Sequence, residues 1–231
     1  MDPRQRLIVA LDVPTAAAAR KIVAAVGDSA LTYKVGMQLY TAEGPSIVRE
    51  LVGSGRHVFL DLKYHDIPNT VGAAVREAAQ LGVSLLTVHA SGGGKMLRAA
   101  VETARAAKPD LLVLAVTVLT SMNDVDLGMI GLRGGVLDQV LRLAALALSN
   151  GCQGVVASAH EAAALRQEFG RDFAIVTPGV RPAGSGHGDQ ARVVTPAEAI
   201  AAGASHIVVG RPITEAADPA AEARAILGQI G

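Results

Sequence analysis

The sequence predicts a single-domain (β/α)8 barrel, of the TIM barrel class, that takes in residues 1–231. Short apolar runs alternate with alanine-rich amphipathic runs along the whole chain, and eight such pairs can be counted. Eight pairs in 231 residues leave about 29 residues for each, which is the low end of what such a barrel needs. Glycine and proline recur between the runs and do not cluster, so no linker is indicated. A doubly wound open sheet is the rival, which the number of pairs disfavours without excluding it.

The predicted elements follow one another in the same way from one end of the chain to the other. Each strand is a short run of aliphatic or β-branched residues, and each helix has apolar residues three or four positions apart. The first helix also has Pro14 and Thr15 near its start, where both residue types are favoured. The predicted strands are 7–12, 31–35, 57–63, 84–89, 111–118, 154–157, 174–177 and 206–209. The predicted helices are 15–26, 43–51, 68–81, 95–107, 136–149, 159–169, 196–202 and 219–229.

Composition narrows the class of protein. Half of the residues are apolar, 21 basic residues balance 21 acidic ones, and aromatic residues make up only 3%. Such a chain lacks the basic surface and stacking rings that nucleic-acid or membrane-surface binding needs. Cys152 is the only cysteine, and the apolar runs at 7–11 and 137–159 are too short or too interrupted for a signal or a membrane span. We therefore expect a cytoplasmic protein that binds neither nucleic acid nor membrane.

Charged or polar residues stand at the ends of most of the predicted strands. In a β/α barrel the carboxyl ends of the strands carry the active site, so these residues are candidates for it. In chain order they are Asp12, Lys34, Asp61 with Lys63, His89, Thr117 to Ser121, Ser158, Arg181, and Gly210 with Arg211.

The third of these strands ends in two opposite charges. Successive strand residues point to opposite faces, so Asp61 and Lys63 should share one face. With Asp12 and Lys34 they could form an alternating array, in which unit charges 4 Å apart interact by about 4 kcal/mol at an effective dielectric near 20. A lysine between carboxylates stays protonated, which suits a general acid or an electrostatic stabiliser better than a Schiff base. From spacing alone, a structural ion pair with Asp66 as a helix cap before Pro68 is equally open.

Two further strand ends suggest a phosphate site. Gly179 and Arg181 follow the seventh strand, and Gly210 and Arg211 follow the eighth, the quadrant in which barrels frequently bind phosphate. Two glycine turns with surface arginines are the alternative. The polar, glycine-rich loop at 183–194, which contains Gln190, is long for a tight barrel and suggests a lid.

Other patterns are weak. The glycines at 92–94 before Lys95 lack the remainder of a phosphate-loop motif, and the glycines at 184–186 follow no dinucleotide-binding turn. The six histidines show no metal-ligand spacing, so no metal is expected from them.

Taken together, the motifs resemble those of bacterial orotidine 5′-phosphate decarboxylases, nearly from end to end. They are DLKYHDIPNT at 61–70, LD at 11–12, KVG at 34–36, TPGVRP at 177–182, GDQ at 188–190 and GRPI at 210–213. The resemblance implies a barrel enzyme that converts orotidine 5′-monophosphate to uridine 5′-monophosphate and carbon dioxide, without metal or cofactor. This reaction is the last step of pyrimidine synthesis.

The resemblance also implies roles for single residues. Lys63 would protonate C6 of the pyrimidine, Asp61 would lie against the departing carboxylate, and Lys34 would hold the array. The remaining residues would bind substrate, in part across a homodimer with shared active sites. They are Asp12 at the ribose, Thr120 and Ser121 near the base, Arg181, Gln190, Gly210 and Arg211 at the phosphate, and Ile67 and Thr70 in the neighbouring subunit's site. Asp66 would reach into that site as well, as a fourth catalytic residue beside Lys63, Asp61 and Lys34. Tyr64, where the family often has phenylalanine or leucine, and the glycine-rich 184–188 are small departures.

Two alternatives remain open. Hexulose-phosphate synthase and ketogulonate-phosphate decarboxylase are metal-dependent relatives with the same Asp-x-Lys-x-x-Asp signature, but they place a glutamate where this chain has Lys34. The chain could also be a catalytically silent protein that binds a nucleotide phosphate, although an intact charge array is costly to keep for binding alone.

Overall fold

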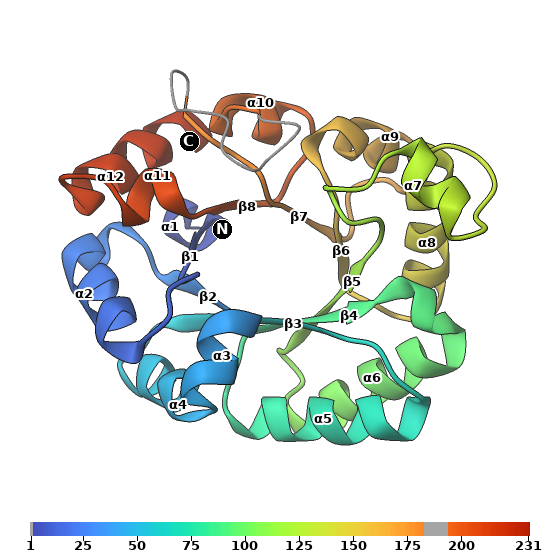
Figure 1. The fold of residues 1–231 in the computed structure, drawn as a ribbon, viewed down its shortest axis with the longest axis horizontal. Helices are drawn as coiled ribbons and strands as arrows, with labels where there is room; N and C mark the ends of the chain where they lie inside the picture. The colour runs from blue at the N-terminus through green and yellow to red at the C-terminus, as the bar shows by residue number, and fades with distance from the viewer. Residues whose placement is uncertain (1, 183–193) are drawn as a thin grey trace.

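Eight parallel strands close into a barrel, and helices surround it (Figure 1). The computed structural model describes residues 2–182 and 194–231. Strand order follows chain order, and the last strand pairs with the first, with Leu7 opposite Ile207. This closure confirms the predicted barrel and excludes the open doubly wound sheet, which would leave two edges unpaired.

The predicted strands are all present, with their ends shifted by a few residues. The strands are β1 (Leu7–Ala10), β2 (Thr32–Gly36), β3 (His57–Tyr64), β4 (Leu85–His89), β5 (Leu112–Val116), β6 (Gly154–Val156), β7 (Ala174–Thr177) and β8 (His206–Val209). The helices at the predicted positions are α2 (Ala16–Val26), α4 (Ser46–Gly53), α5 (Pro68–Gln80), α6 (Gly93–Ala107), α8 (Val136–Ser149), α9 (Ala159–Phe169), α10 (Pro196–Ala201) and α12 (Pro219–Ile230). The described residues form further α-helices that were not predicted: α1 (Pro3–Arg6), α3 (Met37–Glu43), α7 (Asp124–Met129) and α11 (Arg211–Thr214).

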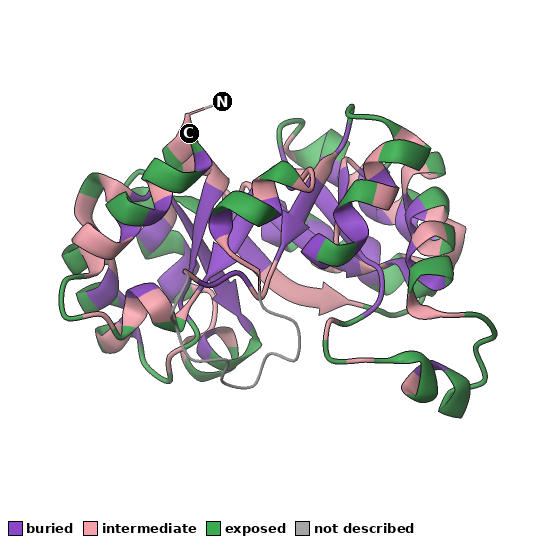
Figure 2. Ribbon diagram, turned by 90° about the horizontal axis from the view of Figure 1, so that it is seen from above, coloured by how far each residue is buried: buried purple, intermediate pink, exposed green. Residues whose placement is uncertain are grey.

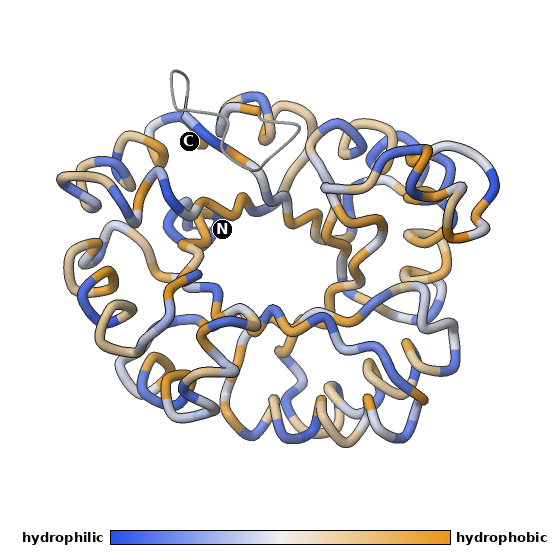
Figure 3. Tube along the Cα trace, viewed as in Figure 1, coloured by the Kyte–Doolittle hydropathy of each residue, from blue (hydrophilic) through white to orange (hydrophobic). Residues whose placement is uncertain are grey.

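The core has two parts because side chains alternate along each strand. In β1, Leu7 and Val9 pack outward against the helices, whereas Ile8 and Ala10 belong to a separate cluster inside the barrel. The buried residues of that inner cluster are Ile8, Ala10, Phe59, Leu85, Leu114, Val176 and Val208. The strands are apolar and buried, while exposed and hydrophilic residues gather on the outer helices (Figures 2 and 3). Charged side chains at the mouth of the barrel therefore lie above a buried apolar layer.

The predicted helix at 43–51 is confirmed as α4, but its start is wrong: α4 begins only at Ser46. A separate helix that was not predicted, α3, ends at Glu43, and Gly44 and Pro45 separate the two. Gly44 ends α3 in a left-handed conformation with φ of 64°, which glycine adopts without steric cost, and Pro45 is the N-cap of α4. Helix α3 buries only Leu39, too weak a periodic signal to be read from the sequence.

The connection between β5 and α8 extends away from the barrel (Figure 2). The sequence predicted only a polar connection, but it contains α7. An Asn123–Asp126 capping box starts this helix: Asn123 Oδ1 accepts from the Asp126 N–H, and Asp126 Oδ2 accepts from the Asn123 N–H. Across the described ranges, no helix has the length and apolar character needed to cross a membrane.

Candidate active site

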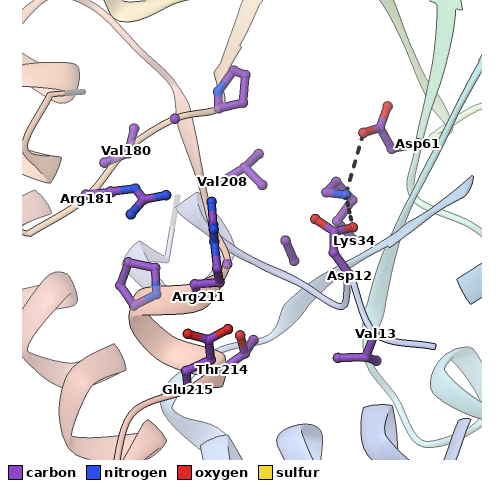
Figure 4. A pocket seen from close by; sticks show the side chains of 15 residues that line it. Asp12, Val13, Lys34, Asp61, Val180, Arg181, Val208, Arg211, Thr214 and Glu215 are labelled. Carbon is purple, nitrogen blue, oxygen red and sulfur yellow. Dashed lines mark hydrogen bonds and ion pairs between the residues drawn. The ribbon is translucent and has the colours of Figure 1, made fainter. Parts of the chain in front are cut away.

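Four charged residues at three neighbouring strands, β1 to β3, form an alternating array in the barrel mouth. Figure 4 shows three of them, Asp12, Lys34 and Asp61. Lys34 Nζ lies 2.7 Å from Asp12 Oδ1 and 3.8 Å from Asp61 Oδ2. Lys63 Nζ lies 2.9 and 3.0 Å from the two carboxylate oxygens of Asp61. The structure thus brings together the array that the strand ends suggested, with the order acid, base, acid, base.

The inner members of the array are shielded from water. The side chains of Lys34 and Asp61 are 11% and 13% exposed and that of Lys63 is 26% exposed, whereas that of Asp12 is 59% exposed. Solvent screens the Asp12 charge more than the others, so the strongest coupling is among the inner three. A Cβ at Gly36 would lie 3.0 Å from both Asp12 Oδ1 and Lys34 Nζ, tighter than ordinary contact. The glycine at this position leaves room for the pair to close.

Strand β3 is irregular where it delivers Lys63. Pairing with β4 shifts between Leu60 and Tyr64, and Lys63 adopts a left-handed conformation with φ of 53°. The simple alternation expected from the sequence therefore breaks at Lys63, although its ammonium still reaches Asp61. Thr87 of β4, which sequence reasoning missed, hydrogen-bonds to both residues. A polar side chain at an inward position of an apolar strand was the signal that could have found it.

A pocket of about 440 Å³ separates the array from two arginines. The guanidinium ends of Arg181 and Arg211 lie on one side of it, and the carboxylates of Asp12 and Asp61 lie on the other (Figure 4). Gly179, with φ of 74°, and Gly210 bring backbone to the arginine side. The full lining is Ala10, Asp12, Val13, Lys34, Asp61, Pro178, Gly179, Val180, Arg181, Val208, Gly210, Arg211, Pro212, Thr214 and Glu215. Guanidinium groups and backbone amides bind phosphate oxygens, whereas the carboxylates of Asp12 and Asp61 would repel them. The arginine side of the pocket is therefore the one that suits a phosphate.

Thr214 and Glu215 also line this pocket, although neither was predicted from the sequence. Both stand at the end of the short helix α11, on the same side as Arg211 (Figure 4). Their nearness to the GRPI motif was the available signal, but a four-residue helix has no periodicity to place them.

A second, smaller cavity of about 150 Å³ opens on the other side of the array. Its walls are mainly apolar, and Lys34, Asp61, Pro178 and Val208 line it as well as the first pocket, so the two adjoin. The other lining residues are Phe59, Lys63, Val116, Val118, Leu119, Thr120 and Val156. Thr120 is thus a lining residue of this cavity. Ser121 is exposed and is not part of the lining.

Asp66, Ile67 and Thr70 lie apart from both cavities in the described chain. All three are exposed, and the Ile67 residue is 66% accessible. The Asp66 helix-cap interpretation is wrong: the N-cap of α5 is Ile67, which makes no side-chain cap, and Asp66 Oδ1 accepts from the adjacent Ile67 N–H at 2.6 Å and not from an N–H inside the helix.

Two histidines meet beside the array: His89, one of the strand-end candidates from the sequence, and His65, which had no predicted role. The rings of His65 and His89 lie 5.3 Å apart, tilted by 31°. Burial lowers the pKa of His89 below its usual value; His65 and Lys63 lower it further, and Asp61 opposes them. The neutral form of His89 is therefore favoured next to Lys63.

Gln190 and most of the predicted lid at 183–194 lie outside the described residues. Within those described, no three His, Cys, Asp or Glu side chains cluster as a metal site would need.

Comparison with known proteins identifies the family. The model of the orotidine 5′-phosphate decarboxylase / HUMPS family matches residues 5–226. The chain belongs to this family. Among its relatives, the orotidine 5′-phosphate decarboxylase of Halorhodospira halophila is 54% identical over 97% of this chain and 95% of its own length. That of Anaeromyxobacter sp. strain K is 55% identical over 98% of each chain.

Solved structures of the family agree with this fold. The crystal structure of the Lactobacillus acidophilus orotidine 5′-phosphate decarboxylase matches with a TM-score of 0.89 and 40% identity, covering 98% of this chain and 99% of that one. The resemblance that the motifs indicated is therefore confirmed, and the array, the arginine pocket and the apolar cavity stand in a barrel of the decarboxylase family.

Proposed function

We propose that this protein decarboxylates orotidine 5′-monophosphate to uridine 5′-monophosphate, the last step of pyrimidine synthesis, in the cytoplasm and without metal or cofactor. The observation that carries the proposal is the array of Asp12, Lys34, Asp61 and Lys63 between an arginine pocket and an apolar cavity. Relatives that are 54% and 55% identical over nearly the whole chain carry the decarboxylase name, which supports the same substrate here.

The two cavities suggest where each part of the nucleotide binds. The 5′-phosphate lies against Arg181, Arg211 and the Gly210 amide, and the ribose hydroxyls lie against Asp12. The pyrimidine then reaches over Asp61 and Lys63 into the apolar cavity, with Thr120 at its edge. Gln190, beyond the described residues, is proposed as a further phosphate ligand. In this pose the scissile carboxylate comes next to Asp61 and the reacting C6 next to the Lys63 ammonium.

Charge that develops during the reaction explains the arrangement. When the bond from C6 to the carboxylate breaks, carbon dioxide leaves and the electron pair stays on C6. The Lys63 ammonium stabilises that charge and donates its proton to C6, and Asp61 holds the ammonium in place at 2.9 Å. This stabilisation by Lys63 is specific to the transition state, because C6 carries no such negative charge in the bound substrate. Lys34, between Asp12 and Asp61, holds the two carboxylates together.

Lys34 also bears on the metal-dependent relatives. The Lys34 ammonium on β2, 2.7 Å from Asp12, occupies the position where those enzymes place a carboxylate for magnesium.

The test of the proposed reaction is the ultraviolet absorbance of purified protein with orotidine 5′-monophosphate, with and without a chelator. We expect a chelator-resistant change to the spectrum of uridine 5′-monophosphate. No change with folded protein would reject the decarboxylase proposal, and turnover of a sugar phosphate only with magnesium would favour the relatives.

We further propose a homodimer in which Asp66, Ile67 and Thr70 complete the partner's site. Their exposure at the start of α5, where no side chain caps the helix, supports this arrangement. Burial of the Ile67 side chain against a partner subunit would remove apolar surface from water, which is favourable.

A mixed dimer tests the shared site. Lys63→Ala and Asp66→Ala chains, each inactive as a homodimer, are coexpressed with different tags and the heterodimer is purified. We expect about half of the wild-type activity, because one of its two sites then has both Lys63 and the other chain's Asp66 intact. The matched control pairs Lys63→Ala with Lys34→Ala, which damages both sites and should stay inactive. A Lys63→Ala/Asp66→Ala heterodimer no more active than its parents would contradict the shared site.

A further inference from the structure

Thr87 occupies an inward position on β4, directly beside the array. Its residue is 0% exposed, and it lies two positions after Leu85, which belongs to the cluster inside the barrel. Its chain neighbours Leu86 and Val88 pack outward against the helices. The Thr87 hydroxyl is therefore enclosed in the barrel, where an unpaired polar group is costly and where its hydrogen bonds are screened little by water.

The hydroxyl connects the two residues to which the proposed mechanism assigns the chemistry. Thr87 Oγ1 accepts a hydrogen bond from the Lys63 backbone N–H at 2.9 Å and donates one to Asp61 Oδ1 at 3.0 Å. Because a hydroxyl has one proton, donation to the carboxylate leaves its lone pairs for the amide. A single buried atom thus contacts both the Asp61 carboxylate and the Lys63 backbone.

The contact falls where β3 departs from regular pairing. Leu60 pairs with Leu86, and the next paired residue, Tyr64, faces Val88, so four steps along β3 match two along β4. Lys63 lies inside this irregular stretch with φ of 53°, a conformation that costs a residue other than glycine roughly 1–2 kcal/mol. The Lys63 N–H has lost its place in the ladder, and the Thr87 hydroxyl satisfies it. The same turn of backbone directs the Lys63 side chain onto Asp61.

We propose that Thr87 is a positioning residue, which fixes the Lys63 ammonium and the Asp61 carboxylate relative to one another by hydrogen-bonding the backbone of one and the side chain of the other. The inference rests on the proposed roles of Lys63 and Asp61. It adds a residue that touches no substrate and acts through both of them, and it gives the left-handed Lys63 backbone a function.

The test compares variants that delete or keep the hydroxyl. Thr87→Val preserves shape and removes the hydroxyl, Thr87→Ala removes it without strain if valine prevents folding, and Thr87→Ser keeps it. We expect the deletions to lower kcat about 10- to 100-fold, because small misplacement of reacting groups is expensive, while affinity for uridine 5′-monophosphate changes less than about threefold. Thr87→Ser should retain kcat within about threefold of wild type.

Thr32→Val is the matched control. Thr32 is also a buried barrel threonine, 2% exposed, at the first position of β2. It lies two residues before Lys34, but its hydroxyl donates to the Gln5 carbonyl at 3.3 Å and not to a residue of the array. The Thr32→Val variant should be less stable than the wild type but should keep the wild-type kcat. Wild-type kcat in a deletion variant, or equal losses in the serine and deletion variants, would overturn the inference.

A crystal structure of the deletion variant separates this inference from the proposed reaction, because it needs no activity. Lys63 should leave the left-handed region, or its Nζ should move out of hydrogen-bond range of Asp61. Unchanged geometry would refute the role of Thr87 even if the decarboxylase proposal stands. An inactive wild-type protein with the expected shift would reject the reaction and leave the positioning role intact.

Discussion

Replacing Lys63 by alanine is expected to abolish turnover of orotidine 5′-monophosphate while leaving binding of the product nucleotide largely intact. The ammonium 2.9 Å from Asp61 is the proposed proton donor and the nearest cation to the developing charge at C6. Loss of a general acid typically costs a factor of 10²–10⁴ and loss of an electrostatic donor a similar factor, so we expect a fall in kcat of at least about a thousandfold. The proposed phosphate and ribose contacts are to residues of the other pocket and should persist.

Steady-state kinetics and calorimetric titration with uridine 5′-monophosphate measure the two parts of this prediction. Lys21→Ala is the control, since Lys21 is an exposed lysine on α2 outside both cavities in the described structure, and it should keep the wild-type rate. A Lys63→Ala enzyme with a wild-type-like rate would remove Lys63 from its role.

Replacing Arg211 by alanine is expected to weaken binding of the substrate through its phosphate. Arg211 lines the pocket opposite Asp12, on the same side as Arg181 (Figure 4). A hydrogen bond to a charged group contributes about 1.5–3 kcal/mol, so kcat/KM should fall about 10- to 100-fold. If phosphate binding drives closure of the loop at 183–194, kcat should fall as well.

Orotidine, which lacks the phosphate, provides the control for Arg211→Ala. The variant and the wild type should process the nucleoside at similar, low efficiency, because the lost contact is one that the nucleoside never makes. An unchanged kcat/KM for the nucleotide would refute the phosphate assignment of Arg211.

The strand ends could be predicted because they follow from local rules. Apolar runs and their spacing fix the barrel, and the barrel in turn places the end of every strand at one mouth. That is why Asp12, Lys34 and Asp61 were expected together before any distance between them was known, and the distances of 2.7 and 3.8 Å agree.

What the sequence could not predict depends on contacts between distant segments. The left-handed backbone of Lys63 is stabilised by Thr87, 24 residues later, and no local pattern around Lys63 indicates it. Gly36 is favoured by two distant side chains, Asp12 and Lys34, whose charged ends both lie 3.0 Å from the position that a Cβ would take there. Helices α3 and α7 bury one residue each, so their apolar periodicity is below what a sequence pattern can reveal.

The central claim is that Lys63 stabilises negative charge at C6, and binding of a charged analogue tests it most directly. The measurement is the ratio of two dissociation constants: that of uridine 5′-monophosphate, and that of a uridine 5′-monophosphate analogue with an anionic oxygen on C6. Because an active site binds a mimic of its transition state more tightly than its ground state, wild-type protein should favour the anion by about 10² or more. Lys63→Ala should lose most of that preference. Equal affinity of wild-type protein for the two nucleotides would contradict the account.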